Sequence, residues 1–154
     1  MIRNFERTQR FPAVQAELWK FISSPANLSI ITPPEMGIRM QTDMPGEIYS
    51  GLEINYTVAP IFNIRLRWTT LIEEVNAPYY FTDKQLKGPY AYWEHKHILT
   101  QINEGTEMRD VVKYKLPFGV MGQLAGNKFI SNKIKEIFEF RRIKLIEIFG
   151  SLEL

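Results

Sequence analysis

Apolar and polar residues alternate with a period of two along most of this chain, and helical spacing replaces that period in two stretches. The alternation in residues 4–11 predicts a first strand that ends at Pro12. Apolar residues at helical spacing in residues 13–22 predict a helix. Residues 24–34 predict a second short helix that a proline pair stops.

Six further segments alternate between apolar and polar residues and predict strands. They are residues 37–43, 49–58, 62–74, 80–86, 90–99 and 106–116. The turn sequences KGP and NEG separate the last three segments, as in hairpins. An antiparallel sheet with one face toward solvent produces this alternation, so we expect the six strands to form a meander.

Residues 126–149 predict one long amphipathic helix, because at about 100° per residue seven apolar side chains fall on one arc of its surface. The arc consists of Ile130, Ile134, Ile137, Phe138, Leu145, Ile148 and Phe149. Such a helix must cover the apolar face of the sheet. The expected fold is α+β, with the order β-α-α-β6-α and a curved, seven-stranded antiparallel sheet wrapped around the terminal helix.

The two histidines of the chain lie two positions apart in one predicted strand. Side chains alternate across a strand, which places Trp93, His95 and His97 on one face. The opposite face carries Tyr90, Tyr92, Glu94 and Lys96. Because Glu94 and Lys96 need water more than imidazoles do, both histidines should point toward the terminal helix.

The neighbouring strands bring further residues, several of them polar, to the same inner face. Lys84 and Lys113 mark the outer faces of their strands. The inward positions are then Phe81, Asp83, Gln85, Met108, Asp110, Val112, Tyr114 and Leu116. The long strand 62–74 adds Trp68 and Thr70, so four strands direct both aromatic and polar side chains at one interior.

The terminal helix contributes a positive charge to this interior. Arg141 lies about 20° from Ile130 on the helical wheel, inside the apolar arc. An isolated buried charge costs several kcal/mol, so Arg141 should be paired with Asp83, with Asp110 or with an anionic group of a ligand. We therefore expect a polar network, a hydrated cavity or both, rather than a fully apolar core.

Length and composition fit one domain over residues 1–154. The 19 basic and 17 acidic residues are spread along the chain, which argues against nucleic-acid binding. The absence of cysteine excludes disulfides, zinc ribbons and thiol nucleophiles. The sequence lacks the apolar segment of a signal peptide and any run long enough to span a bilayer, so we expect a cytoplasmic protein.

Two segments resemble a known sequence pattern. The chain reads DKQLKGPYAYWEHKH at 83–97 and GTEMRDVVKYKLPFG at 105–119, and IFEFR at 137–141 is similar to the closing helix of the same proteins. The pattern D-x-Q-x-x-G-P-Y-x-x-W-x-H-x-H followed by G-T-x-x-x-D-x-V-x-Y-x-x-P-x-G is found in a bacterial subfamily of the START-like, or SRPBCC, superfamily. The order of the predicted elements agrees along the whole chain.

The resemblance implies the helix-grip fold, which the superfamily shares with the major birch-pollen allergen and aromatic polyketide cyclases. It also implies a deep cavity between sheet and helix for a hydrophobic or amphipathic small molecule, such as a lipid, sterol, polyketide or quinone. The signature positions that carry over are Asp83, Gln85, Trp93, His95, His97, Asp110, Tyr114 and Arg141. No cofactor follows from the resemblance.

The polar cluster has other interpretations. Two histidines and a carboxylate from Asp83 or Asp110 could ligate a metal ion, although the chain has no third histidine and aromatic residues crowd the site, so we expect no metal. A histidine beside an aspartate could serve as a general acid–base pair of a cyclase or dehydratase, with His95, His97, Asp83 and Asp110 as the candidates. A third interpretation is a structural or partner-binding module, in which the cluster is a polar network that fixes the packing.

Ligand binding is the interpretation that we favour. The residues expected at the ligand are Trp68, Thr70, Phe81, Asp83, Gln85, Trp93, His95, His97, Met108, Asp110, Tyr114 and Arg141. The segment FGVMGQLAG at 118–126 predicts an apolar loop over the mouth of the cavity. Phe140, Ile143 and Ile146 lie off the apolar arc and predict either a homodimer contact or isolated exposed residues.

Overall fold

The computed structural model describes residues 1–60, 63–117 and 120–153. Within these ranges seven strands form one antiparallel sheet in the order β1-β7-β6-β5-β4-β3-β2. The strands are β1 (Arg3–Phe11), β2 (Arg39–Met40), β3 (Glu53–Val58), β4 (Leu66–Asn76), β5 (Tyr80–Lys87), β6 (Tyr92–Ile102) and β7 (Gly105–Lys115). The helices are α1 (Gln15–Ile22), α2 (Val120–Phe149) and the short 3₁₀ helices η1 (Pro25–Ser29) and η2 (Pro34–Met36).

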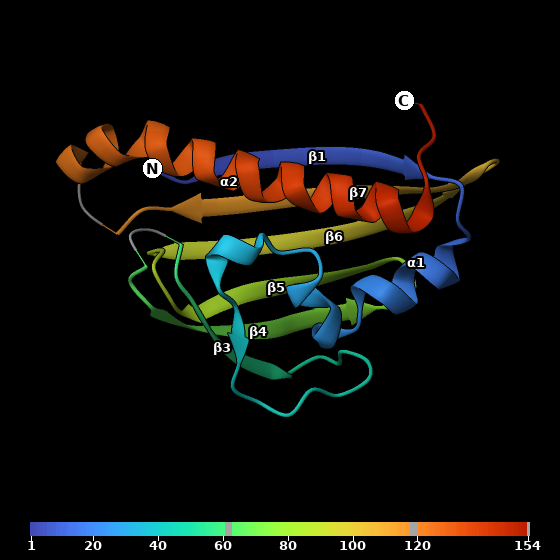
Figure 1. Ribbon diagram of the computed structural model, residues 1–154, viewed down its shortest axis with the longest axis horizontal. Helices are drawn as coiled ribbons and strands as arrows, with labels where there is room; N and C mark the ends of the chain where they lie inside the picture. The colour runs from blue at the N-terminus through green and yellow to red at the C-terminus, as the bar shows by residue number, and fades with distance from the viewer. Residues whose placement is uncertain (61–62, 118–119, 154) are drawn as a thin grey trace.

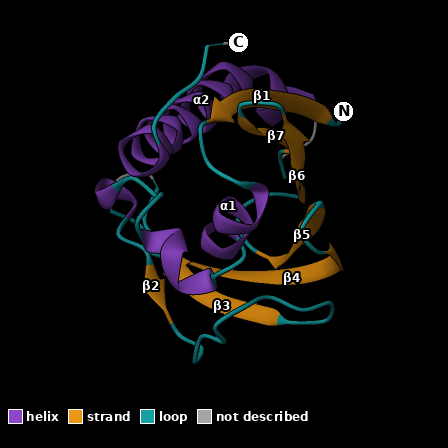
Figure 2. Ribbon diagram, turned by 90° about the vertical axis from the view of Figure 1, so that its right-hand side faces the viewer, coloured by secondary structure: helices purple, strands orange, loops and turns teal. Residues whose placement is uncertain are grey.

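The sheet curves around a hollow that the helices close. Figure 1 shows α2 running along the sheet beside β1 and β7, and Figure 2 shows the sheet bending from there round to β3 and β2. In the same view α1 lies inside the curve. The predicted α+β fold, a curved seven-stranded sheet wrapped around a long C-terminal helix, is confirmed.

The predicted inner face is confirmed most clearly along β7. Met108, Asp110, Val112 and Tyr114 are buried, and Arg109 and Lys113 between them are exposed. On β6, His95, His97 and Leu99 are buried in the same way. Outside, Glu94 lies between Lys84 and Lys113 in an ion-pair network, which explains why this face stays in water.

Three strands are shorter than the alternation predicts. β3 begins at Glu53 rather than at residue 49, because a turn closed by the hydrogen bond from the Leu52 N–H to the Tyr49 carbonyl precedes it. β2 covers only Arg39–Met40 of the expected segment 37–43, because the Thr42 hydroxyl accepts a hydrogen bond from the Asn55 backbone N–H and takes the place of strand pairing. β4 begins at Leu66 rather than at residue 62, since Asn63 has a positive φ of 55° and turns the chain. Residue 62 lies outside the described residues.

The terminal helix begins earlier than predicted. α2 starts at Val120, so the expectation of a loop at 118–126 is wrong for the residues from 120 onward, while Phe118 and Gly119 lie outside the described residues. Each glycine lowers helix propensity by about 1 kcal/mol relative to alanine, which is why the sequence predicted a loop. Tertiary context can override a preference of this size, and here the helix continues through the glycines. No helix in the described part of the chain is long and apolar enough to cross a membrane.

Two side chains point in directions that the patterns did not predict. Tyr90 packs inward against Trp68 and Trp93, with ring centroids 5.7 and 4.9 Å away, because β6 begins only at Tyr92 and Tyr90 belongs to the preceding turn. Ile148 is 44% exposed. It lies about 60° from the line of the buried Ile134, Phe138 and Leu145 at 100° per residue, in the last turn of α2.

Candidate ligand-binding site

A cavity of about 590 Å³ lies between the inner face of the sheet, α2 and the segment that contains α1, η1 and η2. Most of its walls are apolar, and its volume falls within the range of about 300–1,000 Å³ that is usual for small-molecule sites. Ile64 and Phe129 line the cavity and are themselves 59% and 51% exposed. The cavity therefore opens to solvent where these two residues lie.

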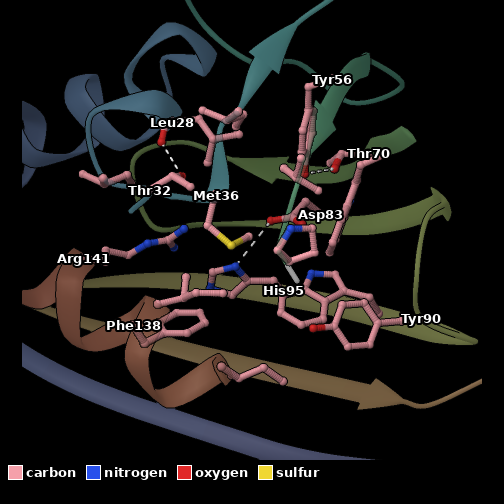
Figure 3. Close-up of a pocket in the computed structure, with 18 of the residues that line it drawn as sticks. Leu28, Thr32, Met36, Tyr56, Thr70, Asp83, Tyr90, His95, Phe138 and Arg141 are labelled. Atoms are coloured by element: carbon pink, nitrogen blue, oxygen red, sulfur yellow. Dashed lines mark hydrogen bonds and ion pairs between the residues drawn. The ribbon is translucent and has the colours of Figure 1, made fainter. Parts of the chain in front are cut away.

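One wall of the cavity is polar and is formed by adjacent strands. On β5, Asp83 stands opposite His95 of β6, and His97 stands opposite Asp110 of β7. The short hydrogen bonds run diagonally across these pairs: His95 Nε2 lies 2.8 Å from Asp110 Oδ1, and His97 Nε2 lies 2.9 Å from Asp83 Oδ2. Figure 3 shows Asp83 and His95 at this wall, facing α2. We call these four residues the His–Asp cluster.

The two imidazoles lie against each other with their planes tilted by 35°, and aromatic rings contact both. Their ring centroids lie 3.7 Å apart. The ring of Phe81 stacks on His97 at 4.0 Å, and Phe138 of α2 meets His95 edge-on at 5.3 Å. These contacts fix the plane of each imidazole, so the hydrogen bonds to the carboxylates have a defined direction.

Both carboxyl groups of the cluster are ionised. Burial by itself raises the pKa of Asp110, but hydrogen bonds from His95 and His97 outweigh it and hold that pKa well below its ordinary value. Burial also raises the pKa of Asp83, but the hydrogen bond from His97 and the nearby charges of the imidazoles and of Arg141 together outweigh it and lower that pKa. Asp110 is only 1% exposed, so these hydrogen bonds are what keeps its charge inside the protein.

The two histidines differ in charge. Burial, followed by the positive charge of His97, lowers the pKa of His95 to about 4. Burial also lowers the pKa of His97, but hydrogen bonds to Asp110 and Asp83 more than compensate and raise it above its ordinary value. Near neutral pH the cluster therefore holds a neutral His95 and favours a protonated His97 between two carboxylates.

Arg141 reaches the cavity from the opposite side, from the middle of α2. Its guanidinium lies 4.9 Å from the centre of the Phe138 ring, and the side chain is 8% exposed. Within the described part of the chain it forms no ion pair, and its buried Nε has no hydrogen-bond partner. The expected pairing with Asp83 or Asp110 is therefore absent, because both carboxylates are bonded to the imidazoles instead. Figure 3 shows the side chain extending from the helix into the pocket.

Comparisons with known proteins give structural matches only. No protein-family model matches the sequence, and no curated protein matches it. Protein Ms6760 from Mycobacterium smegmatis matches with a TM-score of 0.68 at 14% identity, over 94% of this chain and 89% of that chain. Ara h 8.0201 matches with a TM-score of 0.62 at 14% identity, over 94% of this chain and 99% of that chain. The major latex-like protein 151 from Panax ginseng gives 0.65 at 8% identity, over 94% and 95%.

The matches extend over nearly the whole length of both partners, and at such identities they establish the fold alone. The chain has the helix-grip fold. The fold that the resemblance to the START-like, or SRPBCC, superfamily implied is thereby confirmed. The narrower bacterial subfamily stays a prediction.

The helix-grip cavity brings together most of the residues predicted from the sequence. Nine of them line it: Trp68, Thr70, Phe81, Asp83, Trp93, His95, His97, Met108 and Arg141. Asp110, Gln85 and Tyr114 do not line it. Asp110 lies behind the imidazoles, and Tyr114 is 3% exposed beneath the rings of Tyr90 and Trp93.

Gln85 has a role in the turn rather than in the cavity. Its side chain donates a hydrogen bond to the Tyr90 carbonyl at 2.7 Å and accepts one from the Tyr90 N–H at 3.2 Å. Gly88 lies directly beneath this side chain, where a Cβ atom would collide with it. Gln85 therefore stabilises the connection between β5 and β6. Alternation along the strand predicted its inward direction, but the hydrogen bonds to Tyr90 keep its side chain in the turn and away from the ligand cavity.

Several lining residues were not among the predicted site residues. Leu28, Thr32 and Met36 come from the segment of η1 and η2, and Tyr56 comes from β3. The position of Tyr56 could have been predicted, because Tyr56 belongs to the apolar face of its strand. Its hydroxyl lies 3.2 Å from the Thr70 hydroxyl. The η1–η2 segment had no periodic pattern from which its position over the cavity could be predicted.

One group of described residues offers a set of metal-ligand atoms. Single atoms of Asp83, His95 and His97 lie within 4.8 Å of one another. Two of these atoms, His97 Nε2 and Asp83 Oδ2, already form a hydrogen bond of 2.9 Å. A metal ion would have to displace that hydrogen bond, so the internal cluster competes with any metal.

Replacing Arg141 by methionine is expected to stabilise the ligand-free protein. The substitution removes an unpaired buried charge and also loses about 1 kcal/mol of interaction with the Phe138 ring. The net increase in the free energy of unfolding should be roughly 1 to 3 kcal/mol. For a chain of this length each kcal/mol raises the melting temperature by about 2 to 4 °C. Thermal unfolding of delipidated protein measures the shift.

Arg142→Met is the matched control for this measurement. Arg142 is the next residue of α2, faces outward and pairs with Glu139 at 2.7 Å. Its substitution should leave the melting temperature unchanged or slightly lower. A melting temperature of Arg141→Met below that of the wild type would show that Arg141 is satisfied in the ligand-free protein.

Proposed function

We propose that this protein binds one hydrophobic or amphipathic small molecule in the cavity between the sheet and α2. The observation that carries the proposal is the cavity of about 590 Å³ itself, whose walls are mostly apolar and which Asp83 and His97 on the sheet and Arg141 on α2 supply with charged groups. Apolar walls supply affinity for the body of a ligand, and a few convergent polar groups fix its orientation. A lipid, a polyketide or a quinone has this combination of properties.

The residues that we assign to the ligand are those that line the cavity. Trp68, Trp93, Phe81 and Met108 contact the apolar body, and Met108 adapts most easily to its shape. Asp110 acts behind them as a positioning residue, because it holds both imidazoles. We place the protein in the cytoplasm as a single domain over residues 1–154.

The His–Asp cluster does not favour an enzymatic role as a cyclase or dehydratase. Such a role needs a histidine that can exchange a proton with the substrate. The Nε2 atoms of both histidines are bonded to carboxylates of the protein, and the Nδ1 atoms face carboxylates as well, at 3.7 Å for His95 and 3.3 Å for His97. The cluster therefore supports recognition of a polar group better than proton transfer to it.

Binding of the uncharged fluorophore N-phenyl-1-naphthylamine tests the proposal. Its fluorescence should rise on binding to the wild type with one-to-one stoichiometry. Ile54→Trp places a larger side chain at a buried lining position of β3 and should weaken the affinity by about tenfold, or about 1.4 kcal/mol. Glu53→Trp is the matched control, because the neighbouring Glu53 points to solvent.

The outcome decides between a cavity and a surface site. Equal loss of affinity in Ile54→Trp and Glu53→Trp, or no binding by the wild type, would contradict the proposal. Circular dichroism of both variants shows whether the fold is retained, so a lost signal from an unfolded variant is recognised.

A further inference from the structure

We propose that the natural ligand is an anion, and that Arg141 binds its acidic group inside the cavity. This inference rests on the proposed function and adds the chemical class of the ligand. The observation behind it is the unpaired guanidinium on α2, which is more than nine-tenths buried and directed into the cavity.

The hydrogen-bonding capacity of Arg141 is almost entirely unused. A guanidinium has five N–H donors and no acceptor. Its guanidinium faces the Phe138 ring, which interacts with the charge and accepts none of the in-plane hydrogen bonds, and Asp83 acts on it through space without a hydrogen bond. A carboxylate, sulfonate or phosphate offers two oxygens that match two parallel N–H groups, which is the strongest arrangement for a guanidinium.

The protein's own carboxylates are not free to take this place. Asp110 Oδ1 is bonded to His95 and Asp83 Oδ2 to His97, at 2.8 and 2.9 Å. Neither carboxylate forms an ion pair with the guanidinium among the described residues. The imidazoles therefore hold both carboxylates by hydrogen bonds, and the Arg141 guanidinium is left without a carboxylate partner among the described residues.

A second buried group of the cavity points to the same kind of ligand. Trp68 lines the cavity, and its buried indole N–H has no hydrogen-bond partner among the described residues. Buried polar groups in native proteins are nearly always hydrogen-bonded, so each exception needs an explanation. Both unpartnered buried atoms belong to residues that line this cavity and are donors only, so this part of the wall lacks acceptors, which a ligand with acceptor oxygens would supply.

The charges around the site set the expected selectivity. Among the described residues that line the cavity, the charged groups are Arg141, Asp83, the protonated His97 and Lys133. Asp83, Asp110 and the protonated His97 give the cluster one net negative charge, but hydrogen bonds to the imidazoles hold both carboxylates. Arg141 is then the charged group at that depth whose N–H donors are open to a ligand. An acidic headgroup should therefore bind better than a neutral one, and a neutral one better than an amine.

Three probes with the same twelve-carbon chain test this order: dodecanoate, dodecan-1-ol and dodecylamine. Displacement of N-phenyl-1-naphthylamine at neutral pH gives the affinity of each. The wild type should bind dodecanoate about tenfold more tightly than dodecan-1-ol, a difference of about 1.4 kcal/mol. Arg141→Met should abolish this preference while its affinity for dodecan-1-ol changes little. Arg142→Met should behave like the wild type.

Each result has a defined meaning. If dodecan-1-ol binds as tightly as dodecanoate, or if Arg141→Met keeps the preference for the acid, the inference is wrong and the proposed function stands. If dodecylamine binds most tightly, Asp83 is the recognising group and the inference is wrong as well. If the fluorophore binds and none of the probes displaces it, the inference is wrong and the proposed function stands; if the folded protein does not bind the fluorophore, the failure lies with the proposed function. Because Arg141→Met removes an unpaired charge, it should fold, and its melting curve confirms this.

Discussion

Asp110→Ala is expected to lower the free energy of unfolding by about 3 to 5 kcal/mol, the usual cost of removing one partner of a buried charged pair. The carboxylate is 1% exposed and accepts a hydrogen bond from His95 Nε2 at 2.8 Å, with His97 Nδ1 at 3.3 Å. Its removal leaves the protonated His97 with Asp83 alone and leaves the N–H of His95 without an acceptor. Typical domains are stable by about 5 to 15 kcal/mol, so this loss is a large fraction of the total. Urea unfolding at neutral pH measures it.

Two substitutions show whether the loss comes from the cluster. Asp110→Asn keeps the shape and one acceptor oxygen, so it should cost less than Asp110→Ala. Glu107→Ala removes another carboxylate of β7, which pairs with Arg10 at 2.8 Å in a partly exposed position, and should cost less than about 1 kcal/mol. Similar small losses for Asp110→Ala and Glu107→Ala would mean that the cluster contributes little to stability.

Mild acid is expected to destabilise the protein through His95. The pKa of this histidine is about 4 in the folded state and about 6.5 in the unfolded chain. Between these values the unfolded state binds one more proton, so stability falls as the pH decreases through the window. The full effect is roughly 3 kcal/mol, and we expect a decrease of about 1 kcal/mol between pH 6 and pH 5.

The second histidine contributes with the opposite sign. The pKa of His97 is raised in the folded state, so its stabilising contribution is complete below the unfolded pKa and is lost as the pH rises through the folded value. In the window below pH 6 it is nearly constant. The slope in this window therefore reports on His95.

Substitutions by glutamine separate the two histidines, because the glutamine amide can still donate a hydrogen bond to a carboxylate without titrating. His95→Gln should remove most of the decrease in stability between pH 6 and pH 5. His97→Gln should retain the larger part of that decrease, because burial, the main cause of the lowered pKa of His95, is unchanged and only the charge of His97 is lost. The account of His95 is wrong if the wild type and His95→Gln show the same pH dependence of unfolding in urea.

Alternation along the strands predicted the inner face well because it depends on local geometry alone. The side chains of His95, His97 and Asp110 are buried as their positions in the strands required. The partners within the cluster could not be predicted in this way. They depend on the register between strands, and the register places Asp83 opposite His95 while the short hydrogen bonds run along the diagonals.

The helical wheel likewise predicted which way the Arg141 side chain points, but not its distance from the aspartates. It placed Arg141 on the buried side of α2, as the structure does. Whether Arg141 reaches an aspartate depends on how far the helix stands from the sheet, and the cavity keeps them apart. The position of the η1–η2 segment over this cavity follows from tertiary packing and had no periodic signal in the sequence.

Native mass spectrometry of gently purified protein tests the central claim most directly. If the cavity holds a small molecule, the 18.1 kDa chain should carry one bound molecule per protein, and this mass should be released on unfolding. Ile54→Trp should carry less of it, and Glu53→Trp should carry as much as the wild type. The claim is contradicted if the wild type is found without a ligand and also takes up neither dodecanoate nor N-phenyl-1-naphthylamine when they are added.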